Sequence, residues 1–70
     1  MPQFIDAGKA VREAQIIKRF SSSELARQCA TSPSQVIRWR TQVNMKVHTM
    51  QRICEALDID VETFINLGMD

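Results

Sequence analysis

Three polar side chains that share one side of a short predicted helix are the residues best suited to recognition chemistry. Ser34, Gln35 and Arg38 fall within an arc of roughly 100° when successive residues turn by about 100°, as in an α-helix. Arg can fork onto guanine O6 and N7, Gln can fork onto adenine N6 and N7, and Ser adapts to either. Ile37 flanks this arc, where it either contacts a thymine methyl group or is simply exposed or covers a crevice. All three side chains can therefore hydrogen-bond base edges from one side of the helix.

Helix-start signals around these residues predict two short helices joined by a tight turn. Ser21 and Glu24 form an S-x-x-E capping box for the first helix. Ser32 caps the second helix, and Pro33 takes its first position, where the missing N–H costs nothing. The two caps are eleven residues apart, at 21 and 32, which leaves room for about two helical turns and a corner. This is the layout of a helix-turn-helix.

Residues 11–67 resemble the phage repressor/Cro-type helix-turn-helix family. S-S-S-E-L-A-x-x-x-A-T-S-P-S-Q-V-x-R-W-R is similar to that family's second and third helices. M-Q-R-I-C-E-A-L-D-I-D-V-E-T-F-I is similar to its fourth helix and the start of its fifth. The resemblance implies binding to a double-stranded DNA operator, with a recognition helix from Ser32 to about Thr41 in the major groove. S-Q-V-I-R-W-R and the following Lys46-containing loop also resemble lysogeny activators of the phage lambda type.

The chain departs from the family pattern at three places. Ser22 stands where the family usually has Gln, which weakens any specific contact assigned to it. Ala30 replaces the usual turn Gly, so we expect a helical rather than a left-handed residue there. No Gly follows the recognition helix before Gly68, which leaves the shape of the next loop open.

Other polar residues are of the types that hold phosphates and so fix register without reading sequence. By resemblance, the loop after the recognition helix lies over the sugar-phosphate backbone. The expected backbone contacts are Ser22, Arg40, Thr41, Asn44 and Lys46. Val43 and Met45 are apolar in this loop, and they either tuck under it or face a second subunit.

Apolar side chains at helical spacing predict three further helices, which makes an all-α, compact bundle of about five short helices. In the segment 9–19, the inward residues are Val11, Ala14 and Ile17. In the segment 47–57, they are Val47, Met50, Ile53, Cys54 and Leu57. A last helix begins after Asp60 and ends at Gly68, while residues 1–8 are expected to be a frayed lead.

Seventy residues make one domain at most, and by the resemblance we expect a single helix-turn-helix DNA-binding domain spanning residues 1–70. The net charge is only +1, but its distribution is uneven. Between Leu25 and Cys54 the charged residues are all basic, and from Glu55 to Asp70 they are all acidic. One face can therefore approach phosphate while the other stays away from it, although two ordinary solvated faces would give the same pattern. With no apolar run that could span a membrane and no secretory leader, we expect a cytoplasmic, nucleoid-associated protein.

The last helix is more apolar than one small core requires, which favours a homodimer. The residues expected at the dimer interface are Phe64, Ile65 and Leu67. RNA polymerase or another regulator is a further possible partner, because the sequence does not separate a Cro-like repressor from an activator. A protein-interaction module on the same fold, such as an antirepressor or antitoxin-like partner, also stays open. Surplus apolar residues favour that second class: Ile16, Ile37, Val43 and Met45.

The residues give no support for an enzyme, a cofactor or a metal site. His48 is the one histidine and has no metal-spaced partner, and no glycine-rich phosphate loop is present. Cys29 and Cys54 lack C-x-x-C spacing, so we interpret them as buried, reduced thiols rather than a disulfide or redox switch. Trp39 is expected to anchor the core rather than to stack on a base.

Overall fold

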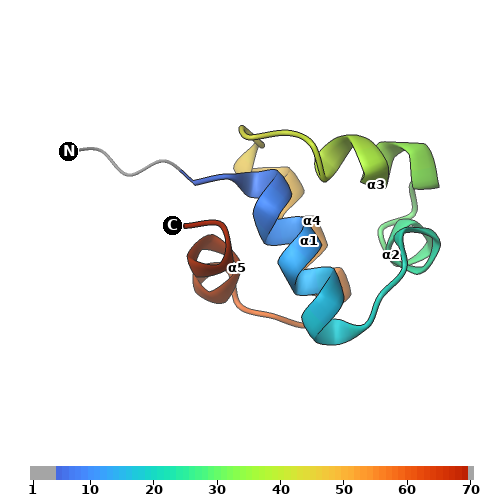
Figure 1. The fold of residues 1–70 in the computed structure, drawn as a ribbon. Helices are drawn as coiled ribbons and strands as arrows, with labels where there is room; N and C mark the ends of the chain where they lie inside the picture. The colour runs from blue at the N-terminus through green and yellow to red at the C-terminus, as the bar shows by residue number, and fades with distance from the viewer. Residues whose placement is uncertain (1–4, 70) are drawn as a thin grey trace.

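Five helices form the regular structure of residues 5–69, the part of the chain that the computed structural model describes. They are α1 (Ala7–Lys18), α2 (Ser22–Gln28), α3 (Pro33–Trp39), α4 (Val47–Leu57) and α5 (Val61–Leu67). Figure 1 shows α1 crossing the centre against α4, with α2 and α3 forming a corner on one side and α5 on the other. The expected all-α bundle of about five short helices is confirmed.

The helix-turn-helix begins with the caps that the sequence predicts. The Oγ atom of Ser21 accepts the N–H of Glu24 at 3.1 Å, and that of Ser32 accepts the N–H of Gln35 at 3.2 Å. Glu24 pairs with Arg27 one turn further on, and this hydrogen bond and charge lower the pKa of the Glu24 carboxyl. Both partners are exposed to water, so the pair adds little stability. The two serines therefore define where the two helices start.

The turn between α2 and α3 contradicts one expectation. Ala30 has φ 56°, which is left-handed rather than helical. Its neighbour Thr31 donates its N–H to the carbonyl of Ala26 at 2.9 Å, the long-range bond of a Schellman ending. This ending needs a left-handed residue directly after the helix, which is where glycine is usually found. Ala30 therefore adopts a left-handed conformation at a steric cost.

The core forms where all five helices meet, and Trp39 anchors it with 4% of its surface exposed. Leu25, Ile53 and Phe64 are among the side chains that are fully buried around it. The role predicted for Trp39 is confirmed.

Two residues expected to face inward are exposed instead. Ile17 is 58% exposed and Val47 is 64% exposed, because each lies in a terminal turn of its helix, beyond the residues that pack against neighbouring helices. Gln15 is the last buried residue of α1, and its side-chain Nε2 donates to the carbonyl of Phe20 at 3.2 Å. At this end of α1, the side chain of Gln15 therefore covers the core, whereas the sequence pattern predicted that Ile17 would do so.

The two cysteines are free and buried, as the sequence analysis predicted. Burial disfavours the thiolate and raises the pKa of both Cys29 and Cys54. Arg52 opposes this rise at Cys29, whereas the negative charge of Asp60 adds to it at Cys54. Both thiols therefore favour the protonated form that suits a core position.

The expectation of a frayed lead over residues 1–8 is wrong for residues 7 and 8. Its first four residues lie outside the described part of the chain, but Ala7 and Gly8 are buried and belong to α1. Asp6 caps this helix, because its side-chain oxygen accepts the N–H of Lys9 at 3.1 Å. Between residues 5 and 69, no helix is long and apolar enough to cross a membrane, and no group of three potential metal ligands is found.

The left-handed Ala30 generates a stability prediction. Ala30→Gly should raise the free energy of unfolding by about 0.5–1 kcal/mol. The change removes about 1–2 kcal/mol of strain from the left-handed conformation. Glycine also raises the conformational entropy of the unfolded chain, but this offsets only part of the gain. Urea titration followed by circular dichroism measures the change. Ala56→Gly, in the last turn of α4, is the control, and it should lower the free energy of unfolding by up to about 1 kcal/mol. A lower stability for Ala30→Gly would show that Ala30 is not strained.

Candidate nucleic-acid interface

The side of α3 that faces away from the core carries most of the predicted base-reading residues. Val36 and Trp39 point into the core, while Ser34, Ile37 and Arg38 are exposed. Gln35 is half-buried at the edge of this surface. With about 100° between successive residues, Ser34 lies at the centre of the exposed side, with Arg38 about 40° to one side and Ile37 about 60° to the other. Arg38 has no ion-pair partner among the described residues, so its guanidinium is available to a ligand.

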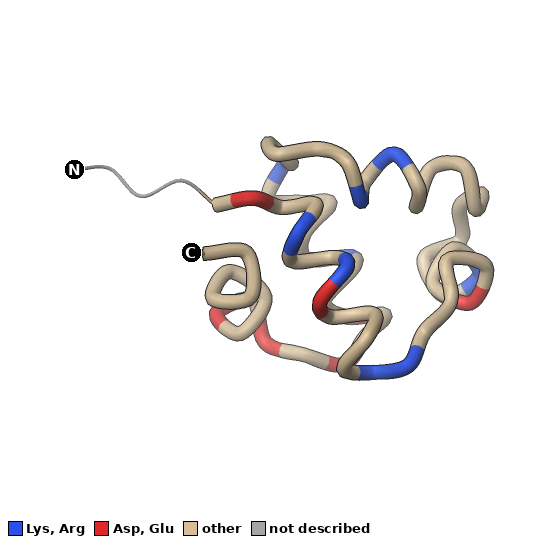
Figure 2. Tube along the Cα trace, viewed as in Figure 1, with Lys and Arg blue, Asp and Glu red and all other residues tan. Residues whose placement is uncertain are grey.

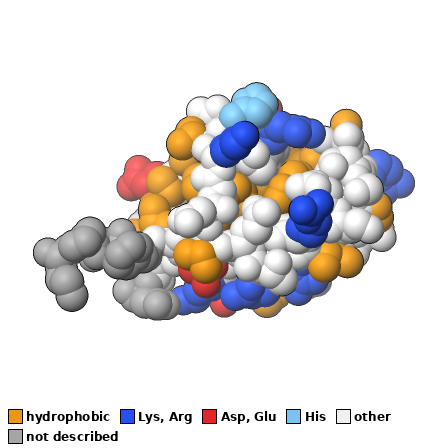
Figure 3. Space-filling model, turned by 90° about the horizontal axis from the view of Figure 1, so that it is seen from above, with side chains coloured by type: hydrophobic (Ala, Val, Ile, Leu, Met, Phe, Trp, Pro, Cys, Tyr) orange, Lys and Arg blue, Asp and Glu red, His pale blue; other side chains and the backbone are white. Residues whose placement is uncertain are grey.

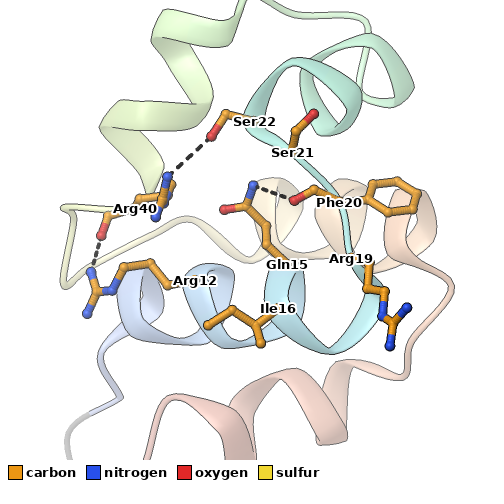
Figure 4. Close-up of a pocket in the computed structure, with 8 residues that line it drawn as sticks. All are labelled: Arg12, Gln15, Ile16, Arg19, Phe20, Ser21, Ser22 and Arg40. Atoms are coloured by element: carbon orange, nitrogen blue, oxygen red, sulfur yellow. Dashed lines mark hydrogen bonds between the residues drawn. The ribbon is translucent and has the colours of Figure 1, made fainter.

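One flank of α3 is joined to the start of α2. Nη1 of Arg40 donates to Oγ of Ser22 at 3.4 Å, which brings together two of the predicted backbone contacts (Figure 4). A hollow of about 320 Å³ opens beside them. Among the described residues, no carboxylate lines it. Its lining is Arg12, Gln15, Ile16, Arg19, Phe20, Ser21, Ser22 and Arg40. Arg12, Arg19 and Arg40 make the lining basic, although the guanidinium of Arg19 points away from that of Arg40 (Figure 4). This basic lining favours an anion such as a phosphate.

Arg40 is more engaged within the protein than its expected role required. It is half-buried, and its Nε is buried without a hydrogen-bond partner among the described residues. Its main-chain carbonyl accepts a hydrogen bond from Arg12 of α1 (Figure 4). Oε1 of Gln15, which lines the same hollow, is also buried and unpaired. Arg40 therefore joins three helices as well as presenting charge at this flank.

The other flank of α3 is formed by the segment that leads to α4. Gln42, Asn44 and Lys46 line a second hollow, of about 330 Å³, together with Gln35 and Trp39 of α3. Asn44 and Lys46 are exposed, as a contact to a phosphate requires. Thr41 is exposed too, although its hydroxyl donates to the carbonyl of Arg38 at 2.9 Å and extends the end of α3. The predicted backbone contacts are thus divided between two flanks.

The start of α1 holds this connecting segment in place, a contact that sequence reasoning missed. Ala7 N–H donates to the carbonyl of Val43 at 3.0 Å, and Gly8 N–H donates to that of Gln42 at 2.6 Å. A Cβ atom on Gly8 would lie 2.5 Å from the carbonyl oxygen of Arg40, so only glycine allows this approach. The one available signal was Asp6, which is a capping residue three positions before Lys9. The shape of the connecting segment therefore depends on α1 and not on a glycine of its own.

Met45 and Val43 have different positions in this segment. Met45 is half-buried and packs against the core, while Val43 is 53% exposed. The alternatives left open for these residues are thus resolved for Met45, which tucks under the segment. The carbonyl of Val43 accepts the N–H of Ala7 at the start of α1.

The residues expected at a dimer interface are not equally available. Phe64 is fully buried inside the subunit, so it offers no surface to a second copy. It points inward because α5 packs with it against α1 and α4. Ile65 and Leu67 are half-exposed and can still meet a partner.

Basic residues follow the recognition side of the molecule. Figure 2 shows Lys and Arg on α3, both signs of charge on α1 and α2, and Asp and Glu on α5 and the segment before it. Seen from the side of α3, basic side chains are spread over the face, and acidic ones lie at its margins (Figure 3). This separation is the electrostatic arrangement expected of a surface that approaches phosphates.

Residues 12–68 match the Cro/C1-type HTH DNA-binding domain. The match covers α2 to α5 and most of α1, including both flanks of α3. Comparisons with curated proteins and with solved structures gave no match.

The contact of Gly8 with the segment after α3 generates a prediction. In Gly8→Ala, the added methyl group must push the carbonyls of Arg40 and Gln42 away, which should cost about 1–3 kcal/mol of stability. The displaced segment should also weaken binding to duplex DNA by about tenfold, the equivalent of one hydrogen bond to a charged group. Binding is measured by fluorescence anisotropy under conditions where the variant is fully folded.

Ala56→Gly in the last turn of α4 is the control. The change should also lower stability, because glycine is a poorer helix former than alanine. Ala56 lines neither hollow beside α3, so the folded variant should keep its DNA affinity. Equal affinities for the Gly8 and Ala56 variants would show that the start of α1 does not position the interface.

Proposed function

Because the chain belongs to the Cro/C1-type helix-turn-helix DNA-binding family, we propose that it is a sequence-specific transcriptional regulator of the Cro-like repressor type. The observation that carries the proposal is the exposed side of α3, with Ser34 and Arg38 on it and a polar flank on each side. A helix presented in this way fits the major groove, while its flanks meet the phosphates of the groove walls.

Two kinds of contact divide the work. Ser34, Gln35 and Arg38 read base edges, and Arg38 favours guanine because its fork matches O6 and N7. Ser22 and Arg40 hold the backbone on one wall, and the other wall is held by Thr41, Asn44 and Lys46. The wall contacts supply affinity by releasing counterions, and they fix the position from which α3 reads the bases.

A homodimer completes the proposal. One short α3 makes few base contacts, so two copies on an inverted repeat, with half-sites about 34 Å apart, would give a regulator adequate affinity. Ile65 and Leu67 of α5 are the surface residues that support this assembly. Bound at the nucleoid, a dimer of this kind represses by occupying DNA. An activator of the lambda lysogeny type would in addition need a surface for RNA polymerase.

The proposal is tested by selecting binding sites from a randomised pool of duplex DNA, with Arg38→Ala selected in parallel. The wild-type protein should enrich an inverted repeat. Arg38→Ala should lose about 1–3 kcal/mol of binding free energy and relax one base position in each half-site. A recovered direct repeat would favour the activator type. If Arg38→Ala weakened binding to every sequence equally, Arg38 would hold a phosphate and would not read a base.

Lys46 gives a separate prediction for the groove wall. Lys46→Ala should weaken binding to all sequences alike, because the lost contact is to a phosphate. The slope of log K against log salt should fall by about one, which is measured by repeating the titration over a range of salt concentrations. Gln51→Ala, an exposed change on α4 outside both flanks, is the control and should leave the slope unchanged. An unchanged slope for Lys46→Ala would remove Lys46 from the interface.

A second class of function is favoured by one observation. Ile16 and Ile17 are 71% and 58% exposed on the last part of α1, and neither belongs to the core, although Ile16 lines the hollow beside Ser22 and Arg40. Exposed apolar side chains in adjacent positions suit a protein partner, as in an antirepressor or antitoxin-like module. No enrichment of any duplex, at low as well as high salt, would decide for this class and against the DNA reader.

A further inference from the structure

Ile37 is an apolar side chain on the side of α3 that is otherwise polar. It is 55% exposed, and its exposed neighbours on the helix are Pro33, Ser34 and Arg38. The described residues include five large exposed apolar side chains, of which Ile37 is the one on α3. Its side chain faces the solvent and does not belong to the core. A polar residue would satisfy the fold equally well at this place.

The placement of Ile37 relative to the two flanks is asymmetric. Ile37 precedes Arg40 by three residues, and Gln35 precedes Arg38 by three, so each pair lies on one side of the helix. Arg40 contacts Ser22, whereas Gln35 lines the hollow that holds Asn44 and Lys46. On the exposed side of α3, Ile37 therefore lies nearer to the flank of Ser22, and Arg38 lies nearer to the flank of Lys46.

We propose that Ile37 selects a thymine by packing its side chain against the C5-methyl group of that base. The inference rests on the proposed function, in which α3 occupies the major groove. It adds an apolar reader on the Ser22 side of the helix to the polar readers Ser34, Gln35 and Arg38. The thymine belongs to the half of the groove whose wall is held by Ser22 and Arg40.

The chemistry of the groove determines which base this side chain accepts. The thymine methyl is the one apolar group that the four ordinary bases present in the major groove. Against any other edge, Ile37 would cover hydrogen-bonding atoms without replacing their bonds to water, which is unfavourable. Ile37 therefore favours thymine through burial of a methyl group and disfavours the other bases through lost hydration.

The test uses the duplex enriched by the wild-type protein, with each thymine in turn replaced by deoxyuridine. This change removes the methyl group and leaves the hydrogen-bonding groups of the base unchanged. At one position in each half-site, the wild-type protein should lose affinity by about fourfold, the effect of exposing one methyl-sized group. Ile37→Ala should bind the thymine and deoxyuridine duplexes with equal affinity at that position.

Two controls make the result specific to Ile37. Arg38→Ala should keep the loss at the same deoxyuridine position, because Arg38 lies on the other side of Ser34. A pair of 5-methylcytosine and guanine should bind the wild-type protein more tightly than cytosine and guanine there, and Ile37→Ala should not distinguish them. Thermal unfolding of Ile37→Ala should match the wild type, because the side chain is outside the core.

The outcomes separate this inference from the function on which it rests. A protein that enriches no duplex would overturn both. If a duplex is enriched but no deoxyuridine position weakens binding, or Ile37→Ala shows the same weakening, only the role of Ile37 is overturned.

Discussion

The packing of the start of α1 against the segment that leaves α3 is the contact on which the candidate interface depends. The N–H groups of Ala7 and Gly8 have no acceptor within their own helix, and they donate to the carbonyls of Val43 and Gln42. The free N–H groups at the start of the helix and the free carbonyl groups of the irregular segment therefore pair with one another. The absence of a side chain at Gly8 is what allows the two backbones to approach. The segment that carries Asn44 and Lys46 is thereby held against the body of the domain instead of depending on its own sequence.

This arrangement separates residues that build the interface from residues that face outward on it. Arg40 and Ser22 contact each other, so their geometry is fixed by the protein before any ligand binds. Ser34 and Arg38 are exposed, and their residue types and helical spacing were sufficient to predict their place. The internal engagement of Arg40 was not predictable, because it requires α1, α2 and α3 to be placed relative to one another. Sequence reasoning thus identified candidate contacts but not the interactions that position them.

The parts of the fold that could be predicted are those set by neighbours in sequence. The caps at Ser21 and Ser32 involve residues three positions apart, so the starts of these helices could be predicted from the sequence. Apolar periodicity predicted the inner faces of the helices, but it continued to Ile17, past the point where neighbouring helices stop covering α1. The handedness of Ala30 was missed because alanine prefers the helical conformation, and the turn imposes a left-handed one. Gly8 was missed because its role is to approach a segment more than thirty positions away, between residues 40 and 43.

Native-state amide hydrogen exchange, followed residue by residue by NMR, tests the central contact most directly. If the start of α1 holds the segment after α3, the amides of Ala7 and Gly8 exchange slowly, through opening that approaches global unfolding in free energy. The buried helix amide of Val11 provides the reference for that limit. Exchange of Ala7 and Gly8 at the rate of an unstructured peptide, with Val11 protected, would contradict the account. The start of α1 would then be frayed, and the segment carrying Asn44 and Lys46 would have no anchor.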